Sequence, residues 1–250
     1  MARIVSIHSY RGGTGKSNLT ANLATTIAGM GVRVGVVDTD IQSPGIHVIF
    51  GLDEVKINRT LNDYLWGRCS VEDTAYNIPL PKLPPGGAVY LIPASSKTGE
   101  ITRILREGYD VSLLNDGFQS VMERLRLEYL FIDTHPGMNE ETLLSIAISD
   151  VVVLILRPDR QDFQGTAVTV EVARKLNVPR LLLVINKALP TMDLAALRDQ
   201  VEATYNAPVA GLFPLSMEML ELGSSGVFCL QYPYHTYTQE VRKVAQQVMA

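Results

Sequence analysis

The feature that most constrains this chain is a glycine-rich turn near its start, placed between a strand and a helix. Residues 4–7 form an apolar run typical of a buried strand, and residues 18–24 carry apolar side chains at helical spacing. The turn between them is made of Tyr10, Arg11, Gly12, Gly13, Thr14, Gly15, Lys16 and Ser17. A strand, a glycine-rich turn and the start of a helix, in this order, are typical of a loop that binds phosphate groups.

The residue types of this turn suit a polyphosphate. The glycines let backbone N–H groups approach phosphate oxygens, and the N-terminus of the following helix adds partial positive charge. Lys16 can reach the outer phosphates, and Ser17 can offer its hydroxyl to Mg²⁺. We therefore predict that ATP binds here with Mg²⁺, through Arg11, Gly12, Gly13, Thr14, Gly15, Lys16, Ser17 and Asn18. The alternative is a glycine turn without a ligand.

Two further apolar runs end in aspartates. Residues 33–37 predict a strand that leads to Asp38 and Asp40, and residues 129–132 predict another that ends at Asp133. The carboxyl ends of parallel strands form the ligand edge of an open sheet. We expect Asp40 to orient the attacking water, Asp38 to support the hydration shell of Mg²⁺, and Asp133 to hold Mg²⁺ through water. The predicted metal site is therefore Ser17, Asp38 and Asp133. The alternative reads Asp38 and Asp40 as helix-cap or turn residues.

The pair Gly12-Gly13 with a basic residue before it resembles the deviant Walker motif of the ParA/MinD family of positioning ATPases. The resemblance implies that Arg11 stands where the family usually has a second lysine, which crosses a nucleotide-sandwich dimer to touch the partner's phosphates. A guanidinium can hold a phosphate with two parallel hydrogen bonds, although its geometry differs from that of lysine. We predict Lys16, Asp40 and Arg11 as the catalytic residues, with a solvated loop cation as the alternative for Arg11.

The resemblance extends along the chain. It implies that Asn186 contacts adenine, that Pro214 forms a second wall for the base, and that the Gly137 amide senses the γ-phosphate. Ordinary strand termination is the alternative for Asn186 and Pro214. The family more often has a small residue or proline where His135 stands. We interpret His135 as a loop residue that tunes the switch or meets a partner, with a proton carrier as the alternative.

The rest of the chain predicts one α/β domain over residues 1–250, a P-loop NTPase domain with a mostly parallel central sheet and helices on both faces. Its 250 residues, 46% of them hydrophobic, suffice for one continuous core. Further strands are predicted at 89–93, 151–156, 180–185 and 208–214, helices at 61–66, 100–127, 161–176 and 238–249, and a loop at 42–47. We expect the last helix to dock on the sheet, and a membrane anchor is not favoured.

Composition limits the classes of partner. The net charge of −4 gives no global basic field for nucleic acid or anionic membranes, which leaves open only weak, non-specific DNA binding by cations within residues 150–250. Cys69 and Cys229 match neither a disulfide framework nor a paired metal motif, which favours reduced thiols in the cytosol. The sequence has no apolar run of roughly 18 residues that could cross a membrane. We therefore predict a cytoplasmic protein.

Together, these features predict an Mg²⁺-dependent ATPase that converts ATP to ADP and phosphate. The resemblance implies an ATP-dependent homodimer, stimulated by an activator or adaptor protein, that positions a cargo such as a plasmid, a chromosome, a division site or a microcompartment. One alternative is a bacterial tyrosine kinase, suggested by residues 38–44 and by Tyr232, Tyr234 and Tyr237, which we interpret as packing residues. Another is an interaction protein that binds ATP without turnover. A reductase like the nitrogenase iron protein is not favoured, because neither cysteine adjoins Asp133.

Overall fold

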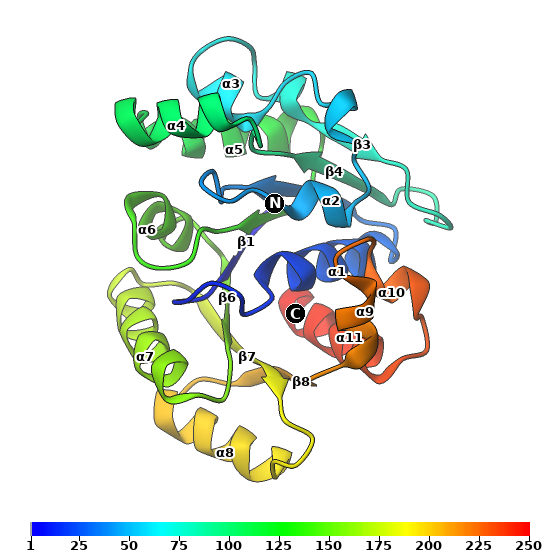
Figure 1. Ribbon diagram of the computed structural model, residues 1–250, viewed down its shortest axis with the longest axis vertical. Helices are drawn as coiled ribbons and strands as arrows, with labels where there is room; N and C mark the ends of the chain where they lie inside the picture. Colours follow the sequence, from blue (N-terminus) through cyan, green and yellow to red (C-terminus); the bar gives the residue numbers. More distant parts are fainter. Residues whose placement is uncertain (1) are drawn as a thin grey trace.

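The computed structural model describes residues 2–250 and contains an eight-stranded sheet (Figure 1). Its strands are β1 (Arg3–His8), β2 (Arg33–Asp38), β3 (Tyr76–Ile78), β4 (Ala88–Ile92), β5 (Tyr129–Asp133), β6 (Val151–Leu156), β7 (Arg180–Ala188) and β8 (Val209–Pro214). The strand order is β3-β4-β2-β5-β1-β6-β7-β8, and β3 pairs antiparallel with β4 while all other neighbours are parallel. The predicted mostly parallel α/β sheet is confirmed.

Helices cover both faces of this sheet (Figure 1). They are α1 (Lys16–Ala28), α2 (Ile46–Ile49), α3 (Leu61–Leu65), α4 (Thr98–Glu107), α5 (Ser112–Arg124), α6 (Glu140–Ala147), α7 (Arg160–Lys175), α8 (Leu194–Tyr205), α9 (Met217–Leu222), α10 (Phe228–Gln231) and α11 (Thr236–Met249). Helices α1, α2, α10 and α11 share one hydrophobic cluster with the sheet. Helices α3 to α5 pack in a second cluster and α6 to α8 in a third, on the opposite face.

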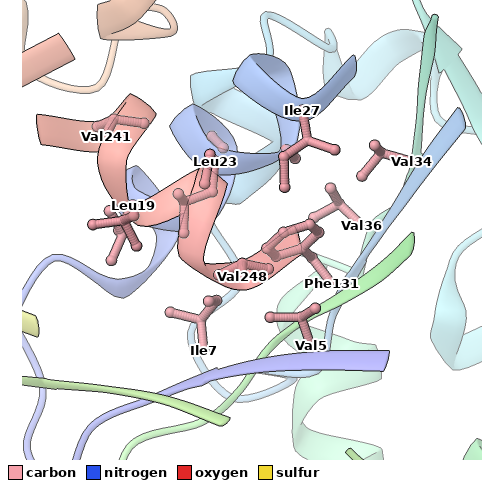
Figure 2. Close-up of a cluster of buried hydrophobic side chains, with 14 of the residues drawn as sticks. Val5, Ile7, Leu19, Leu23, Ile27, Val34, Val36, Phe131, Val241 and Val248 are labelled. Carbon is pink, nitrogen blue, oxygen red and sulfur yellow. The ribbon is translucent and has the colours of Figure 1, made fainter. Parts of the chain in front are cut away.

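The alternation of side chains along the strands explains these layers, because successive residues point to opposite faces. In β1, Val5 belongs to the cluster under α1 and α11, whereas Ile4 belongs to the cluster under α3 to α5. Figure 2 shows Leu23 of α1 and Val248 of α11 meeting over the strands. The predicted docking of the last helix on the sheet is thus confirmed. None of the helices within residues 2–250 combines the length and the apolar character needed to cross a bilayer.

The structure corrects several predicted boundaries. The segment predicted to be mostly helical, 100–127, contains two helices, because Gly108 adopts φ 66° and its N–H closes α4 on the Ile104 carbonyl at 2.9 Å. The predicted end of the loop at residues 42–47 is wrong, because α2 already begins at Ile46. Strand β7 continues to Ala188, so Asn186 lies inside the strand and not beyond it. The short edge strand β3 was not predicted.

Candidate nucleotide-binding site

The glycine-rich turn joins β1 to α1 and has the backbone that glycine makes possible. Gly13 and Gly15 have φ values of 76° and 101°, in the left-handed region that side chains disfavour. Lys16, the first residue of α1, is only 7% exposed, and its Nζ donates a hydrogen bond to the Ser9 hydroxyl at 3.2 Å. Burial lowers the pKa of Lys16, while Asp133 and Asp40 act in the opposite direction. A buried ammonium beside free backbone amides attracts an anion.

Two of the predicted aspartates lie opposite each other on neighbouring strands. The register of β2 and β5 pairs Asp38 with Asp133, and neither side chain is exposed by more than 1%. Burial raises the pKa of Asp133 to about 6, although a hydrogen bond with the Ser17 hydroxyl has the opposite effect on this pKa. Burial also raises the pKa of Asp38, and the charge of Asp133 adds to this. Two carboxylates held this close in the interior would be stabilised by a cation.

The third aspartate, Asp40, lies in the loop after β2 and pairs with a histidine from the loop after β5. His135 Nδ1 lies 2.6 Å from Asp40 Oδ1, and the same oxygen accepts the Ser43 N–H at 3.1 Å. The Asp40 N–H in turn donates to Asp38 Oδ1 at 3.1 Å. The structure therefore brings His135 into direct contact with the predicted catalytic aspartate, a contact that sequence reasoning did not find.

Two cavities adjoin at Gly15 and Asn18, which line both. The larger has a volume of about 350 Å³ and is lined by Gly12, Gly13, Gly15, Lys16, Ser17, Asn18, Asp40, Ser43, Gly45, Ile49, His135, Pro136 and Ser224. The smaller, of about 190 Å³, is lined by Gly15, Asn18, Asn186, Lys187, Pro214, Leu215, Ser216, Met219, Leu220, Gly223, Ser224 and Tyr237. One cavity includes Lys16, Ser17 and Asp40 at a helix N-terminus, and the other includes Pro214, Leu215 and Leu220. Together they suit a phosphate chain joined to a planar base.

Two predicted ligand contacts are engaged with the protein itself. The Asn186 side-chain amide donates to the Thr14 carbonyl at 2.7 Å, and its oxygen accepts the Lys187 N–H at 2.9 Å. In this structure Asn186 therefore anchors the glycine-rich turn to β7. The Gly137 N–H donates to the Ser9 carbonyl at 3.3 Å, a bond that has to open before this amide can meet a phosphate. Base binding by Asn186 and phosphate sensing by Gly137 stay predictions.

Arg11 points to its own chain, where it meets the N-terminal turn of α7. Its guanidinium lies 3.5 Å from Asp162 and 3.6 Å from Asp159. The side chain of Asp162 is 3% exposed and also accepts hydrogen bonds from the backbone N–H of Arg157 at 2.9 Å and from its Nε at 3.0 Å. Arg11 is thus the weakest partner in a network centred on Asp162. Its predicted contact with a second subunit stays a prediction.

His8 is a second residue of the site that sequence reasoning missed. It ends β1, is fully buried, and its Nδ1 lies 2.7 Å from the Thr134 hydroxyl. That hydroxyl donates to the Ile7 carbonyl, so Nδ1 carries the proton and donates. Burial lowers the pKa of His8 to about 3, and Lys16 adds to this effect. A polar residue ending an apolar strand just before the glycine-rich turn was the available signal.

Known proteins are similar to this chain over nearly its whole length. The ParA family model, described as "NUBPL iron-transfer P-loop NTPase", matches residues 1–249. An uncharacterised ATP-binding protein of Methanocaldococcus jannaschii is 25% identical over 250 residues, covering 100% of this chain and 88% of the relative. The flagellum site-determining protein YlxH of Helicobacter pylori is 29% identical over 245 residues, covering 97% of this chain and 76% of the relative.

Among solved structures, the septum site-determining protein MinD of Pyrococcus horikoshii complexed with Mg-ADP is similar, with a TM-score of 0.81. It is 22% identical, and the match covers 99% of this chain and 96% of that one. At this identity the likeness concerns the fold. The match to the family model, by contrast, covers nearly every residue and includes the glycine-rich turn and the strand ends described above. The chain therefore belongs to the ParA/MinD family of P-loop NTPases.

Proposed function

We propose that this protein is a switch that binds and hydrolyses ATP, and that its ATP-bound form is a homodimer that positions an intracellular cargo. One observation carries the proposal: Lys16, the first residue of α1, and Asp40, from the loop after β2, line one cavity at the carboxyl edge of the sheet. A buried cation and a carboxylate that line the same cavity are groups that phosphoryl transfer to water uses. The proposal treats residues 1–250 as one ATPase domain.

In the proposed reaction, a water oxygen forms a bond to the γ-phosphorus while the bond from phosphorus to the bridging oxygen of ADP breaks. The products are ADP and phosphate, and the proton that the water loses leaves with phosphate or solvent. Lys16 is placed to offset the charge of the outer phosphates, and Asp40 to accept a hydrogen bond from the water. Positioning and charge supply the catalysis, because no covalent intermediate with the protein is required.

The residues present fit a Mg²⁺ ion that arrives with the nucleotide. Within residues 2–250 there is no group of three or more His, Cys, Asp or Glu side chains that could hold a metal ion without other ligands. Mg²⁺ at nucleotide sites takes one or two protein oxygens together with phosphates and waters, so such a group is not needed. The Ser17 hydroxyl lies beside Asp133, whose raised pKa reflects a buried carboxylate without full compensation. When bound, Mg²⁺ would neutralise phosphate charge near Ser17, Asp38 and Asp133.

The position of Arg11 supports the homodimer. Its side chain is 39% exposed, and both of its ion pairs are 3.5 Å or longer, so it can leave α7 at a small cost. We propose that it moves to the phosphates of a second subunit when both carry ATP. Since contacts to the γ-phosphate exist only before hydrolysis, nucleotide state would shift the population between monomer and dimer.

The proposed cellular role draws on relatives and stays general. YlxH of Helicobacter pylori is described as flagellum site-determining, and we extend that kind of role, positioning, to this chain. We propose a cytoplasmic location and an activator or adaptor protein as partner. A DNA surface has less support, because Lys175, Arg198 and Lys243 each lie within 4.0 Å of a glutamate carboxylate.

The alternative activities have less support than hydrolysis. Tyr232 stacks on Phe228 with ring centroids 4.6 Å apart, and Tyr237 is buried, so these two are packing residues as predicted. For Tyr234 that prediction is wrong, since the side chain is 88% exposed. A single exposed tyrosine is a poor match to the phosphorylated tail of a tyrosine kinase. An iron carrier has little support from the cysteines, because Cys229 packs on α1 whereas Cys69 follows α3 on the other face.

Release of phosphate from ATP tests the proposal. We expect the wild-type protein to hydrolyse ATP in the presence of Mg²⁺, Asp40→Ala to bind ATP without turnover, and Lys16→Ala to bind ATP weakly. Asp199→Ala, a change of an exposed aspartate on α8, is the matched control and should behave as wild type. Tight ATP binding without hydrolysis by the wild-type protein would support the interaction protein instead. Transfer of phosphate to Tyr234 would support the kinase.

A further inference from the structure

The contact between His135 and Asp40 uses only one of the two carboxylate oxygens of Asp40. Both hydrogen bonds to the Asp40 carboxylate end on the same oxygen: His135 Nδ1 lies 2.6 Å from Oδ1, and the Ser43 N–H reaches it at 3.1 Å. Within residues 2–250 no group donates a hydrogen bond to Oδ2. A carboxylate held through one oxygen keeps the other available for a further donor, and Asp40 lines the cavity of the glycine-rich turn.

We propose that His135 is a positioning residue, which holds Asp40 through Oδ1 so that Oδ2 can accept a hydrogen bond from the attacking water. The inference rests on the proposed ATPase function. An ionised carboxylate only accepts hydrogen bonds, so His135 Nδ1 must carry the proton of this bond. Charge-assisted hydrogen bonds of this length are about twice as strong as neutral ones.

The backbone on either side of this bond is also held. The His135 carbonyl accepts a hydrogen bond from the Thr142 hydroxyl of α6 at 3.3 Å, and Pro136 follows with a fixed φ. On the other side, the N–H of Asp40 is bound to Asp38, which is fully buried. Each partner therefore projects from a fixed backbone, and the side-chain bond joins the loop after β2 to the loop after β5.

The surroundings of His135 argue against a role in packing alone. Its side chain is 23% exposed, and it belongs to none of the three hydrophobic clusters. It lines both the cavity of the glycine-rich turn and a further cavity of about 220 Å³, which is lined in part by Tyr109 and Glu141. A methyl group at this position would leave the core unchanged, whereas Asp40 would lose its only side-chain partner within residues 2–250.

The expected effect is on turnover and not on binding. Without His135, the Asp40 carboxylate can rotate and exchange its two oxygens, so the water acceptor is in place only part of the time. A misplacement of about 1 Å in a reacting group can lower a rate roughly 100-fold, so we expect His135→Ala to lower kcat by about 10- to 100-fold. Because no hydrogen bond within residues 2–250 joins His135 to the glycine-rich turn, KM should change by no more than about twofold.

Three variants at this position separate positioning from structure. The amide nitrogen of asparagine can take the place of Nδ1, whereas that of glutamine reaches the place of Nε2. We therefore expect His135→Asn to recover most of the kcat lost in His135→Ala, and His135→Gln to recover little. Steady-state kcat and KM, the affinity for a non-hydrolysable ATP analogue and the melting temperature are measured for each. If the alanine variant does not fold, the kcat values of the asparagine and glutamine variants are compared with each other.

The outcomes differ for the inference and for the proposed function. If His135→Ala keeps the wild-type kcat while Asp40→Ala is inactive, the positioning role is overturned and the ATPase function stands. Equal kcat values for the asparagine and glutamine variants, or a raised KM at unchanged kcat, also overturn positioning through Nδ1. If the wild-type protein is as inactive as Asp40→Ala, the proposed function fails and the inference fails with it.

Discussion

The network around Asp162 allows a quantitative prediction about how firmly Arg11 is held. Asp162 is 3% exposed and is bound by Arg157 through the backbone N–H and the guanidinium, at 2.9 and 3.0 Å. Loss of one partner of a buried ion pair costs about 3–5 kcal/mol. Arg157 is 27% exposed and keeps a contact with Asp159 at 3.3 Å. We therefore expect the lower end, a loss of about 3 kcal/mol in unfolding free energy for Asp162→Ala.

The expected loss of unfolding free energy for Arg11→Ala is much smaller. Its ion pairs with Asp162 and Asp159 are 3.5 and 3.6 Å long, and its side chain is 39% exposed. Exposed pairs of this kind contribute about 0–1 kcal/mol, so we expect Arg11→Ala to lower the unfolding free energy by about 0.5 kcal/mol. The two changes break the same contact from opposite ends, and they should differ about sixfold in cost, because only one of them leaves a buried network incomplete.

Unfolding in urea without nucleotide measures both values, with the slope compared among variants so that a change in the unfolded state is recognised. Glu171→Ala, which removes an exposed ion pair with Lys175 on the same helix, is the matched control and should leave the unfolding free energy close to that of the wild type. A loss for Arg11→Ala as large as that for Asp162→Ala would refute the reasoning. Arg11 would then be a structural residue that could not leave α7 cheaply to meet a second subunit.

Three further predictions concern single sites. Folding lowers the pKa of His8 from 6.5 to about 3. As the pH falls below about 6.5, the His8 ring therefore becomes protonated in the unfolded chain but not in the folded one, and the free energy of unfolding decreases. From about pH 7.5 to about pH 5.5, urea unfolding of the wild-type protein should lose about 1.4 kcal/mol more than that of His8→Asn, which does not titrate. A Cβ at Gly165 would clash with the Tyr10 ring, so Gly165→Ala should destabilise the wild type but stabilise Tyr10→Ala by about 1 kcal/mol, as thermal unfolding can measure. Burial raises the pKa of Cys229 to about 11 and also raises the pKa of the more exposed Cys69, so a thiol reagent at neutral pH should label Cys69 slowly, and Cys229 only on unfolding.

The sequence was most informative where structure depends on local pattern. Strands β1, β2 and β5 are buried on both faces, and their apolar runs ending in a polar residue predicted both the strands and the edge where Asp38 and Asp133 lie. The turn around Gly15 was equally clear, because its left-handed backbone requires glycine. Boundaries were less certain at 100–127, where apolar spacing continues across the break at Gly108.

Contacts between loops could not be predicted from these patterns. The bond between His135 and Asp40 joins two loops through side chains, and nothing in the periodicity of either segment indicates it. The same holds for Arg11 and Asp162, which meet only because β1 and β6 are neighbours and α7 follows β6. Asn186 was predicted near the nucleotide, but its bond to Thr14 depends on how closely β7 approaches the turn.

The central claim is that ATP in the cavity of the glycine-rich turn joins two copies of this chain. Light scattering of Asp40→Ala with Mg²⁺ and either ATP or ADP tests it most directly, because this variant should hold ATP without consuming it. The account predicts twice the chain mass of 27.5 kDa with ATP and the single-chain mass with ADP. The same mass with both nucleotides, whether of one chain or of two, would contradict it.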